Sequence, residues 1–362
     1  MKINYTKKEL ALIFLDGFLN LDYKHKRAII NLYDDVSEIF TYPDEAIWYL
    51  SENVSKSASN TFNLALNSDY LNELLIKYDE RGVIVVTEES ENYPNRLIPL
   101  EFRPICLYAK GNVNLLNANK TFAIVGSRKT QVDVMRLTES FASDFVNNNV
   151  VIVTGVASGG DKSAIKGAIQ SGKLILVTAS GFDYVKSETN RDLIEKTMQN
   201  GLVISEYAPE IPPKNYYYPI RNRIIAGLGD GTLIVSGNLT SGTRHTADYS
   251  LDYGKEVFCF PYGIGDKTGE LCNNLIKDGA RLVTSINDVF EVMGYELVEN
   301  KALNLTDVER EVYTLIGDGV NSPDLIAIKT GKKIFELIPL LSSLELKGVA
   351  VKNNRNEYTV LK

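Results

Sequence analysis

Small residues and arginines recur in this sequence at several places where a short apolar run ends. Gly126, Ser127 and Arg128 follow one run, and Ser158 and Gly159 follow the next. Further positions of this kind are Arg221, Asn222, Arg223, Ser241 and Gly242. Small residues let a ligand approach the backbone, free N–H groups at helix starts attract phosphates, and a guanidinium group matches phosphate oxygens. Together they predict a phosphate-binding cleft; tight turns without a ligand are the alternative.

Aromatic and basic residues are clustered just before the second group of arginines. Tyr216, Tyr217 and Tyr218 precede Arg221, and Lys214 lies just before the tyrosines. In single-strand binding sites, bases stack on aromatic rings for about 1–3 kcal/mol each while cations follow the phosphates. The cluster therefore favours a polynucleotide over a mononucleotide as the ligand. A loop packed as a lid or as a partner surface is the alternative.

The motifs of tight nucleotide binding and of nucleophilic catalysis are missing. The segment 126–128 has one glycine where the dinucleotide motif GxGxxG requires three, and no Walker A motif occurs. A bound NAD or ATP is therefore not supported, and we expect no cofactor. Within the segment 155–159, Ser158 stands one place too late for the GxSxG nucleophile elbow.

Two other arrangements could carry catalysis. His245 lies four residues after Ser241 and could share a helix face with it, and Asp161 and Asp183 could act as paired carboxylates. A histidine without catalytic duty and carboxylates that cap helices are the preferred interpretations. We therefore expect no catalytic residue. Because His25 is the only other histidine, a zinc site rich in histidine is excluded, and no metal is expected.

Composition limits the site to a local patch on an acidic molecule. The 362 residues include 39 Lys or Arg and 46 Asp or Glu, which gives a net charge of −7. A uniformly basic nucleic-acid-binding surface is therefore not expected. Three cysteines without a CxxC pair, and a start without a secretory signal, predict a protein of the reducing cytoplasm. No apolar window is long enough to span a membrane.

Short apolar runs alternate with helical stretches through the middle of the chain. The runs are 122–125, 150–153, 174–177, 202–205, 232–235, 257–260 and 282–284. They are continuous rather than alternating, as in parallel strands that are buried on both faces. The pattern predicts an α/β fold with a doubly wound, mostly parallel sheet. Ligands bind such sheets beyond the carboxyl ends of the strands, where the small residues and arginines lie.

The flanking segments differ from this pattern. Residues 1–80 have helical spacing and are predicted to form a helical domain before the sheet domain of 81–295. Within the first segment, 51–67 is rich in Ser and Asn and is interpreted as a loosely packed connection. After a polar link, three helices and two short strands predict a winged-helix domain over 304–362. Its third helix could contact duplex DNA, but the nearly neutral charge of this tail equally suits protein docking.

Several segments carry a resemblance to a known family. They are AIVGSR (123–128), TGVASGGD (154–161), GFD (181–183), SEY (205–207), PIRNRIIAGL (219–228), SGT (241–243), KEVFCFP (255–261) and LIKDGARLVTSINDV (275–289). In this order they resemble the DNA-processing protein A (DprA/Smf) family. The resemblance covers about 80–293, and the helical front and the tail lie where the family has its other domains.

The resemblance implies an extended Rossmann-like fold that binds single-stranded DNA without catalysing a reaction. It also implies a helical front domain that is SAM-like or helix-hairpin-helix-like. Members protect incoming strands during natural transformation, load the recombinase RecA onto them, and form homodimers through the Rossmann domain. Matching motifs imply DNA contacts at Gly126, Ser127, Arg128, Ser158, Gly159, Lys214, Tyr218, Arg221, Asn222, Arg223, Ser241 and Gly242.

The sequence departs from the pattern of the family at three positions. Two other functions are the alternatives to DNA binding. Glu188 stands near a Tyr-Pro-Lys-like segment of many members, Ser236 stands where an acidic residue is common, and Gly160 replaces an apolar residue. The main alternative is a nucleotide-processing hydrolase of the Rossmann superfamily, related to phosphoribohydrolases. The stretch 241–244 lacks the glycine pair and the carboxylate of their PGGxGTxxE motif. A protein-interaction scaffold is the third possibility.

Overall fold

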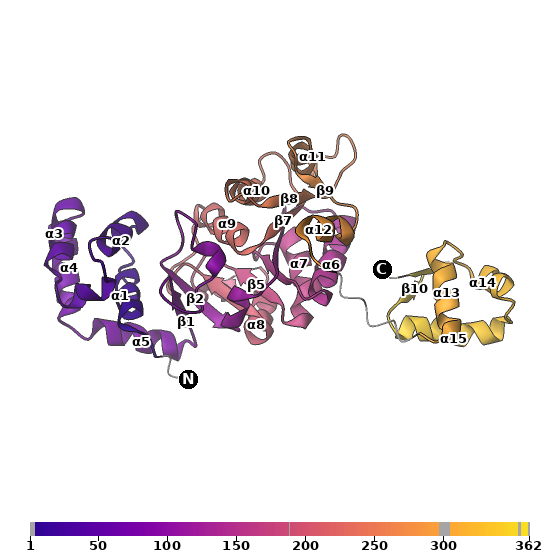
Figure 1. Ribbon diagram of the computed structural model, residues 1–362, viewed down its shortest axis with the longest axis horizontal. Helices are drawn as coiled ribbons and strands as arrows, with labels where there is room; N and C mark the ends of the chain where they lie inside the picture. The colour runs from indigo at the N-terminus through magenta and orange to yellow at the C-terminus, as the bar shows by residue number, and fades with distance from the viewer. Residues whose placement is uncertain (1–3, 188, 297–304, 354–355, 361–362) are drawn as a thin grey trace. The chain divides into compact units, whose positions relative to one another are not determined.

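A computed structural model describes residues 4–187, 189–296, 305–353 and 356–360. The chain divides into two compact units, Met1–Glu296 and Leu297–Lys362 (Figure 1). The first unit contains the N-terminal helices and a large sheet, and the second contains the tail. A further boundary near residue 80, between helical and sheet domains, stays a prediction.

The N-terminal segment is helical, as its apolar spacing predicts. Its α-helices are α1 (Lys7–Asp16), α2 (Tyr23–Ile30), α3 (Asp44–Asn53), α4 (Lys56–Leu66) and α5 (Tyr70–Glu80). Thr6 and Glu9 form a capping box at the start of α1, in which each side chain accepts the other residue's backbone N–H. Phe14 of α1 lies at the centre of this segment and packs against Phe18 and Phe62 with edge contacts.

The expectation of a loosely packed connection over 51–67 is wrong, because most of it is helix α4. Ser55 caps that helix by accepting the backbone N–H of Ala58 at 3.1 Å. Phe62 is completely buried, and the buried Ser59 hydroxyl donates to the carbonyl of Ile47 at 2.9 Å. The Ser and Asn residues therefore cap the helix, bond to its neighbour, or occupy its exposed face.

Nine strands form one sheet in the order β1-β2-β6-β5-β4-β3-β7-β8-β9. Pairing is antiparallel for β1–β2 and β2–β6 and parallel elsewhere, which confirms the predicted mostly parallel sheet. The strands are β1 (Ile84–Thr87), β2 (Cys106–Gly111), β3 (Thr121–Gly126), β4 (Val151–Thr154), β5 (Leu174–Val177), β6 (Leu202–Ser205), β7 (Gly231–Ser236), β8 (Glu256–Cys259) and β9 (Arg281–Leu282). The last strand is shorter than the predicted run 282–284 and lies at the sheet edge.

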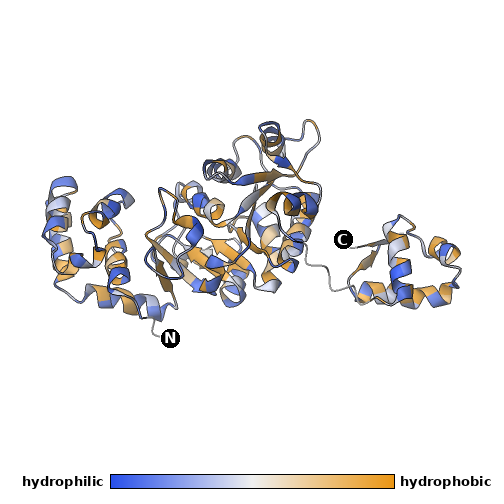
Figure 2. Ribbon diagram, in the orientation of Figure 1, coloured by the Kyte–Doolittle hydropathy of each residue, from blue (hydrophilic) through white to orange (hydrophobic). Residues whose placement is uncertain are grey.

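Helices cover both faces of the sheet (Figure 1). They are α6 (Val132–Asn147), α7 (Gly160–Ala168), α8 (Arg191–Asn200), α9 (Tyr217–Leu228), α10 (Thr243–Asp252), α11 (Glu270–Lys277) and α12 (Ile286–Met293). Phe122 and Ile124 of β3 pack on the side of α6, α7, α8 and α12, whereas Ala123 and Val125 pack on the side of α9, α10 and α11. Figure 2 shows the strands as predominantly hydrophobic, as expected of a sheet that is buried on both faces.

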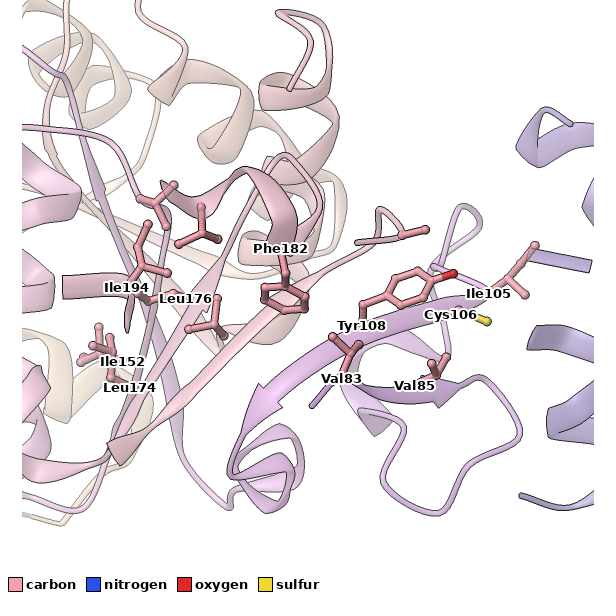
Figure 3. Close-up of a cluster of buried hydrophobic side chains, with 14 of the residues drawn as sticks. Val83, Val85, Ile105, Cys106, Tyr108, Ile152, Leu174, Leu176, Phe182 and Ile194 are labelled. Carbon is pink, nitrogen blue, oxygen red and sulfur yellow. The ribbon is translucent and has the colours of Figure 1, made fainter. Parts of the chain in front are cut away.

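The apolar core continues from the central strands to the antiparallel edge. Figure 3 shows Leu176 and Phe182 near the central strands and Tyr108, Val83 and Val85 on or beside β1 and β2, all in one buried cluster. The N-terminal helices belong to the same cluster through α1 and α5. The sheet and the N-terminal helices therefore share one apolar core.

Buried charged contacts also attach the N-terminal helices to the sheet edge. Lys26 Nζ donates to Asp16 Oδ1 at 2.9 Å, and Asp16 Oδ2 accepts from the Tyr108 hydroxyl at 2.7 Å. Arg27 pairs with the buried Glu88 at 2.6 Å. Since a buried charge is costly without a partner, these pairs hold the two parts in one arrangement.

The second unit has a core of its own. Its elements are α13 (Asp307–Gly317), α14 (Pro323–Thr330), α15 (Ile334–Leu346), β10 (Ala350–Lys352) and β11 (Tyr358–Val360). Val312, Leu337 and Leu341 are buried between the helices, and the two strands pair antiparallel. The winged-helix assignment stays a prediction. Among the described residues of the whole chain, no helix has both the length and the apolar character needed to cross a bilayer.

Candidate nucleic-acid interface

A hollow of about 480 Å³ opens at the carboxyl end of the sheet beside β3. In the sheet order, β4, β5 and β6 lie on one side of β3, and β7, β8 and β9 lie on the other, so the strand order reverses at β3. Ligands of open α/β sheets bind at such a switch point. We call this hollow the cleft. It is lined by Val125, Gly126, Ser127, Arg128, Lys129, Ala157, Asp161, Asn215, Tyr218, Pro219, Arg221, Asn222, Asn238, Thr240, Ser241, Gly242, Thr243 and Thr246.

Ser236, the last residue of β7, holds the turn after β3 by hydrogen bonds. The Ser127 backbone N–H lies 3.1 Å from the Ser236 carbonyl oxygen and 3.0 Å from its hydroxyl oxygen. Thr130 donates to the Ser127 carbonyl at 2.6 Å, and its hydroxyl also lies 2.6 Å from the Ser236 hydroxyl. These bonds fix the backbone of the turn, so that Arg128 projects from a rigid support.

Two glycines let the turns after β3 and β4 touch. Gly159 has φ +78°, and a Cβ there would lie 2.1 Å from the Ser127 carbonyl oxygen. A Cβ on Gly160 would lie 2.5 Å from the Cα of Gly126. Ser158 and Gly159 do not themselves line the cleft. Gly159 instead shapes the cleft, because a larger residue at its position would push the two turns apart.

Arg128 and Tyr218 form a cation–π pair that lines the cleft. The guanidinium carbon of Arg128 lies 5.7 Å from the centroid of the Tyr218 ring, within cation–π distance. Arg128 is exposed and forms no ion pair with a carboxylate of the described residues. Its charge is therefore available to an anion that enters the cleft.

Arg221 is a buried part of the cleft wall. Its Nη1 donates to the Val177 carbonyl at the end of β5, and its Nε donates to Asn222 Oδ1 at 3.1 Å. Gly155 lies against it, since a Cβ there would be 2.9 Å from Arg221 Nη2 and 2.4 Å from Asp161 Oδ2. Arg221 is thus fixed in orientation before any ligand binds.

Asp161 is the acidic residue of the cleft. Its two carboxylate oxygens accept the backbone N–H groups of Gly126 and Ala157, both at 3.3 Å. Burial raises the pKa of Asp161, and the charge of Arg221 and the two N–H groups act against that rise. The carboxylate therefore ties together the turns after β3 and β4.

Arg223 does not line the cleft, although the sequence places it in the same motif as Arg221. It is buried, and its Nη2 donates to Glu206 at the end of β6. Burial alone would lower the pKa of Arg223, but the Glu206 carboxylate raises it. Because neighbouring positions of an α-helix are 100° apart, residues two positions apart lie on nearly opposite sides of α9. Arg223 therefore supports α9 from the side away from the cleft.

The start of α10 forms the opposite wall. Asn222 Nδ2 donates to the carbonyl of Gly242 at 3.2 Å, which links α9 to this wall. The Ser241 hydroxyl oxygen accepts the backbone N–H of Thr243 at 3.3 Å. Its hydroxyl group donates to Thr243 Oγ1 at 3.0 Å. The positive end of the α10 dipole thus faces the cleft.

A half-buried lysine fixes the far end of α9. Lys255 Nζ donates to the carbonyls of Ala226 at 2.9 Å and Gly229 at 2.7 Å, and also to that of Gly227. Burial lowers the pKa of Lys255 to about 8, against the raising effect of Asp230. The last carbonyls of a helix lack partners within it, so this lysine satisfies them.

The structure adds residues to the predicted site. Lining residues that sequence reasoning missed are Val125, Lys129, Ala157, Asp161, Asn215, Pro219, Asn238, Thr240, Thr243 and Thr246. The sequence predicts Asp161 only as a helix cap or as one of two paired carboxylates. Lys129 and Asn215 adjoin predicted residues, and position in the same turn is the signal that could have found them. Lys214 is exposed and lies outside the cleft.

The remaining special positions are placed as follows. Ser236 supports the turn after β3, while Glu188 lies outside the described residues. Asp183 pairs with Arg81 at 3.2 Å. Among the described residues there is no group of three or more His, Cys, Asp or Glu side chains that could hold a metal ion.

Comparisons with known proteins give one consistent result. Residues 84–294, more than half of the chain, match the family model described as DNA recombination-mediator protein A. The DNA processing protein DprA of Bacillus subtilis is 32% identical over 222 residues, which cover 61% of this chain and 75% of the relative. The region that matches the family model, residues 84–294, contains the sheet and every residue that lines the cleft.

Solved structures agree with the sequence comparisons. The X-ray structure of DNA processing protein A from Streptococcus pneumoniae matches with a TM-score of 0.67 at 27% identity, covering 80% of this chain and 98% of that chain. The DNA processing protein A of Helicobacter pylori, whose structure describes its single-stranded DNA binding mode, matches with a TM-score of 0.54 at 27% identity. That match covers 59% of this chain and 97% of the other.

Proposed function

Because this chain belongs to the DNA recombination-mediator protein A family, we propose that it binds single-stranded DNA in the cleft. The observation that carries this proposal is the pair of Arg128 and Tyr218, which places an available cation over an aromatic ring. A single strand offers a phosphate to the first and a base to the second. The Helicobacter pylori relative, which binds single-stranded DNA, supports the same assignment.

The cleft suits a phosphate-bearing strand in its charge and its backbone. Three of its lining side chains are cationic, namely Arg128, Lys129 and Arg221, and Asp161 is anionic. The starts of α7 and α10 add the positive ends of two helix dipoles. Since Asp161 already accepts two backbone N–H groups and the buried Arg221 is bonded within the cleft wall, the exposed Arg128 and Lys129 are the cationic side chains that meet the phosphates.

The predicted contact residues take three roles in this proposal. Those that line the cleft, in which we place the strand, are Gly126, Ser127, Arg128, Tyr218, Arg221, Asn222, Ser241 and Gly242. Ser158, Gly159 and Arg223 act indirectly, because they shape or support the surrounding turns and α9. Lys214 lies outside the cleft, and the contact that we propose for it is treated below.

We propose that the cleft binds and does not catalyse. The Asp161 carboxylate is buried, bonded to two backbone N–H groups and faced by Arg221, so it is poorly placed to take a proton from a substrate. Incubation with nucleoside monophosphates should release no free base. Release that is abolished by Asp161→Asn would instead establish the nucleotide hydrolase.

We further propose that the chain loads RecA onto the bound strand in the cytoplasm and forms a homodimer through its Rossmann-like domain. The family resemblance supports both. The short edge strand β9, with Leu282 about half exposed, is a place where a second copy could pair. Light scattering of the purified chain measures its mass in solution, and co-purification with RecA tests the partner.

Fluorescence anisotropy with a labelled oligothymidine tests the DNA-binding function. We expect binding whose affinity falls as salt is raised, with a slope of about −0.7 for each phosphate contact on a log–log plot. A duplex of the same length should bind more weakly, because its bases are not available to Tyr218. No salt-dependent binding at micromolar protein would contradict the proposal.

A further inference from the structure

We propose that the bound strand continues past the cleft onto a second contact, formed by Tyr207, Lys214, Tyr216 and Tyr217. We call these residues the tyrosine–lysine cluster. Lys214 and the two neighbouring phenols would bind one further phosphate, and the exposed ring of Tyr216 would support a base. This inference rests on the proposed function, because it extends the same strand beyond the cleft.

The rings of the cluster are fixed by their own packing. Tyr217 stacks on Tyr207 with centroids 4.0 Å apart and an interplanar angle of 25°. Tyr216 meets Tyr217 edge to face at 4.6 Å and 69°. Tyr207 follows β6 and Tyr217 begins α9, so the stack joins two rigid elements. A base that lands on Tyr216 therefore meets a surface that is already ordered.

The polar groups of the cluster point to an anion. Lys214 Nζ lies 5.7 Å from the Tyr216 ring centroid and 5.5 Å from that of Tyr217. Hydrogen bonds to Tyr217 and Lys214 lower the pKa of the Tyr216 phenol. The hydrogen bond to Tyr216 raises the pKa of Lys214, so its ammonium stays charged. An ammonium and two phenols together offer several donors to one phosphate.

The exposure of two of its side chains distinguishes this cluster from a loop whose aromatic rings serve only for packing. Tyr216 is 57% exposed, and Lys214 is exposed as well. A loop that merely packed its aromatic rings would cover Tyr216 as it covers Tyr217, which is half-buried. The alternative, a loop ordered by its own rings with no ligand, predicts no role in binding for either exposed side chain.

The cluster begins where the cleft ends. Asn215 and Tyr218 line the cleft, whereas Tyr216 and Tyr217, which lie between them in the chain, do not, and the Tyr217 ring stacks on Tyr207 instead. A strand that leaves over Tyr218 thus meets the cluster next. The negative charge of Asp22, the residue before α2, acts on the Tyr216 phenol and disfavours a further phosphate on that side of the ring.

Two oligothymidines distinguish this inference from the proposed function. One of about four nucleotides occupies the cleft alone, and one of about sixteen also reaches the cluster. Anisotropy titrations compare the unaltered full chain with Tyr216→Ala, Lys214→Ala and Arg128→Ala. Tyr42→Ala is the matched control, since Tyr42 is 66% exposed in the N-terminal segment.

Tyr216→Ala should weaken binding of the longer strand by about fivefold to a hundredfold, as expected for the loss of one stacked base. Lys214→Ala should reduce the salt slope for that strand by about 0.7, which a purely structural role would not do. Neither change should affect the shorter strand, whereas Arg128→Ala should weaken both.

Three results would overturn the inference. Both cluster variants could bind the longer strand like the unaltered chain and the Tyr42→Ala control. Both could lose the two strands equally, which would place the cluster within the cleft. If the unaltered chain bound neither strand, the proposed function would fall together with this inference. If only Arg128→Ala behaved like the unaltered chain, the cleft assignment would fall and the cluster would stand.

Discussion

The three arginines of the motifs differ in what surrounds each guanidinium group. Arg128 is exposed and rests over Tyr218, Arg221 is buried and bonded to the end of β5, and Arg223 is buried against Glu206. Only the first carries a charge that a ligand can reach without displacing a protein partner. Arg128 should therefore contribute most to binding, and Arg223 should contribute through the stability of α9.

Replacement of Arg128 tests this difference directly. Arg128→Ala should lower the affinity for oligothymidine by about tenfold to a hundredfold, the effect of losing a charged hydrogen bond of about 1.5–3 kcal/mol. The salt slope should also fall by about 0.7. Arg136→Ala is the matched control, because Arg136 is an exposed arginine of α6 that lies outside the cleft. Identical titration curves for the two variants would remove Arg128 from the site.

The residue types of the site were predictable from the sequence, whereas the directions in which their side chains point were not. Arg221 and Arg223 appear equivalent in the sequence, yet positions two apart on a helix face nearly opposite sides. Asp161 was harder to interpret, because its partners, the N–H groups of Gly126 and Ala157, come from two different turns. A single sequence does not show that those turns touch.

At the scale of elements, the central strands were predictable because each is a continuous apolar run. The runs 174–177 and 202–205 coincide with β5 and β6. The antiparallel strand β2, by contrast, was not predicted from its pattern, since its pairing with β1 and β6 depends on contacts that are distant in sequence. The helix α4 was not predicted, because Ser and Asn residues are typical of loops. Here they belong to an amphipathic helix that Ser55 caps.

The first helix of the tail is held by one carboxylate. Glu309 Oε1 accepts from the Ser343 hydroxyl at 2.6 Å, and Glu309 Oε2 accepts from Lys347 Nζ at 2.7 Å and from the Thr306 backbone N–H at 2.7 Å. These bonds, with that of Lys347 first, lower the pKa of Glu309 from 4.5 to about 2. The carboxylate thus joins the start of α13 to the end of α15.

This arrangement predicts acid sensitivity of the tail. Between pH 4.5 and about 2 the unfolded tail binds a proton that the folded tail does not, so Glu309 contributes its stability above pH 4.5 and loses it as pH falls through about 2. Hydrogen exchange of the intact chain should show opening of 305–346 as pH falls through this window. Glu309→Gln should exchange several-fold faster at pH 7 and change less with acid. Equal pH profiles for both proteins would contradict this account.

At the scale of the whole molecule, a local excess of cations stands against an overall charge of −7. The cleft has three cationic lining side chains and one anionic one, a local charge of +2. Because the rest of the surface repels polyanions, binding should be confined to the carboxyl edge of the sheet. The acidic composition, which excludes a uniformly basic binding surface, thus favours a narrow and specific site.

A crystal structure of the full chain with a short oligothymidine tests this account most directly. We expect a phosphate within hydrogen-bond distance of Arg128, a base on the ring of Tyr218, and the strand leaving toward Lys214. An oligonucleotide bound on another face, with the cleft unchanged and Arg128 without a phosphate, would contradict the account.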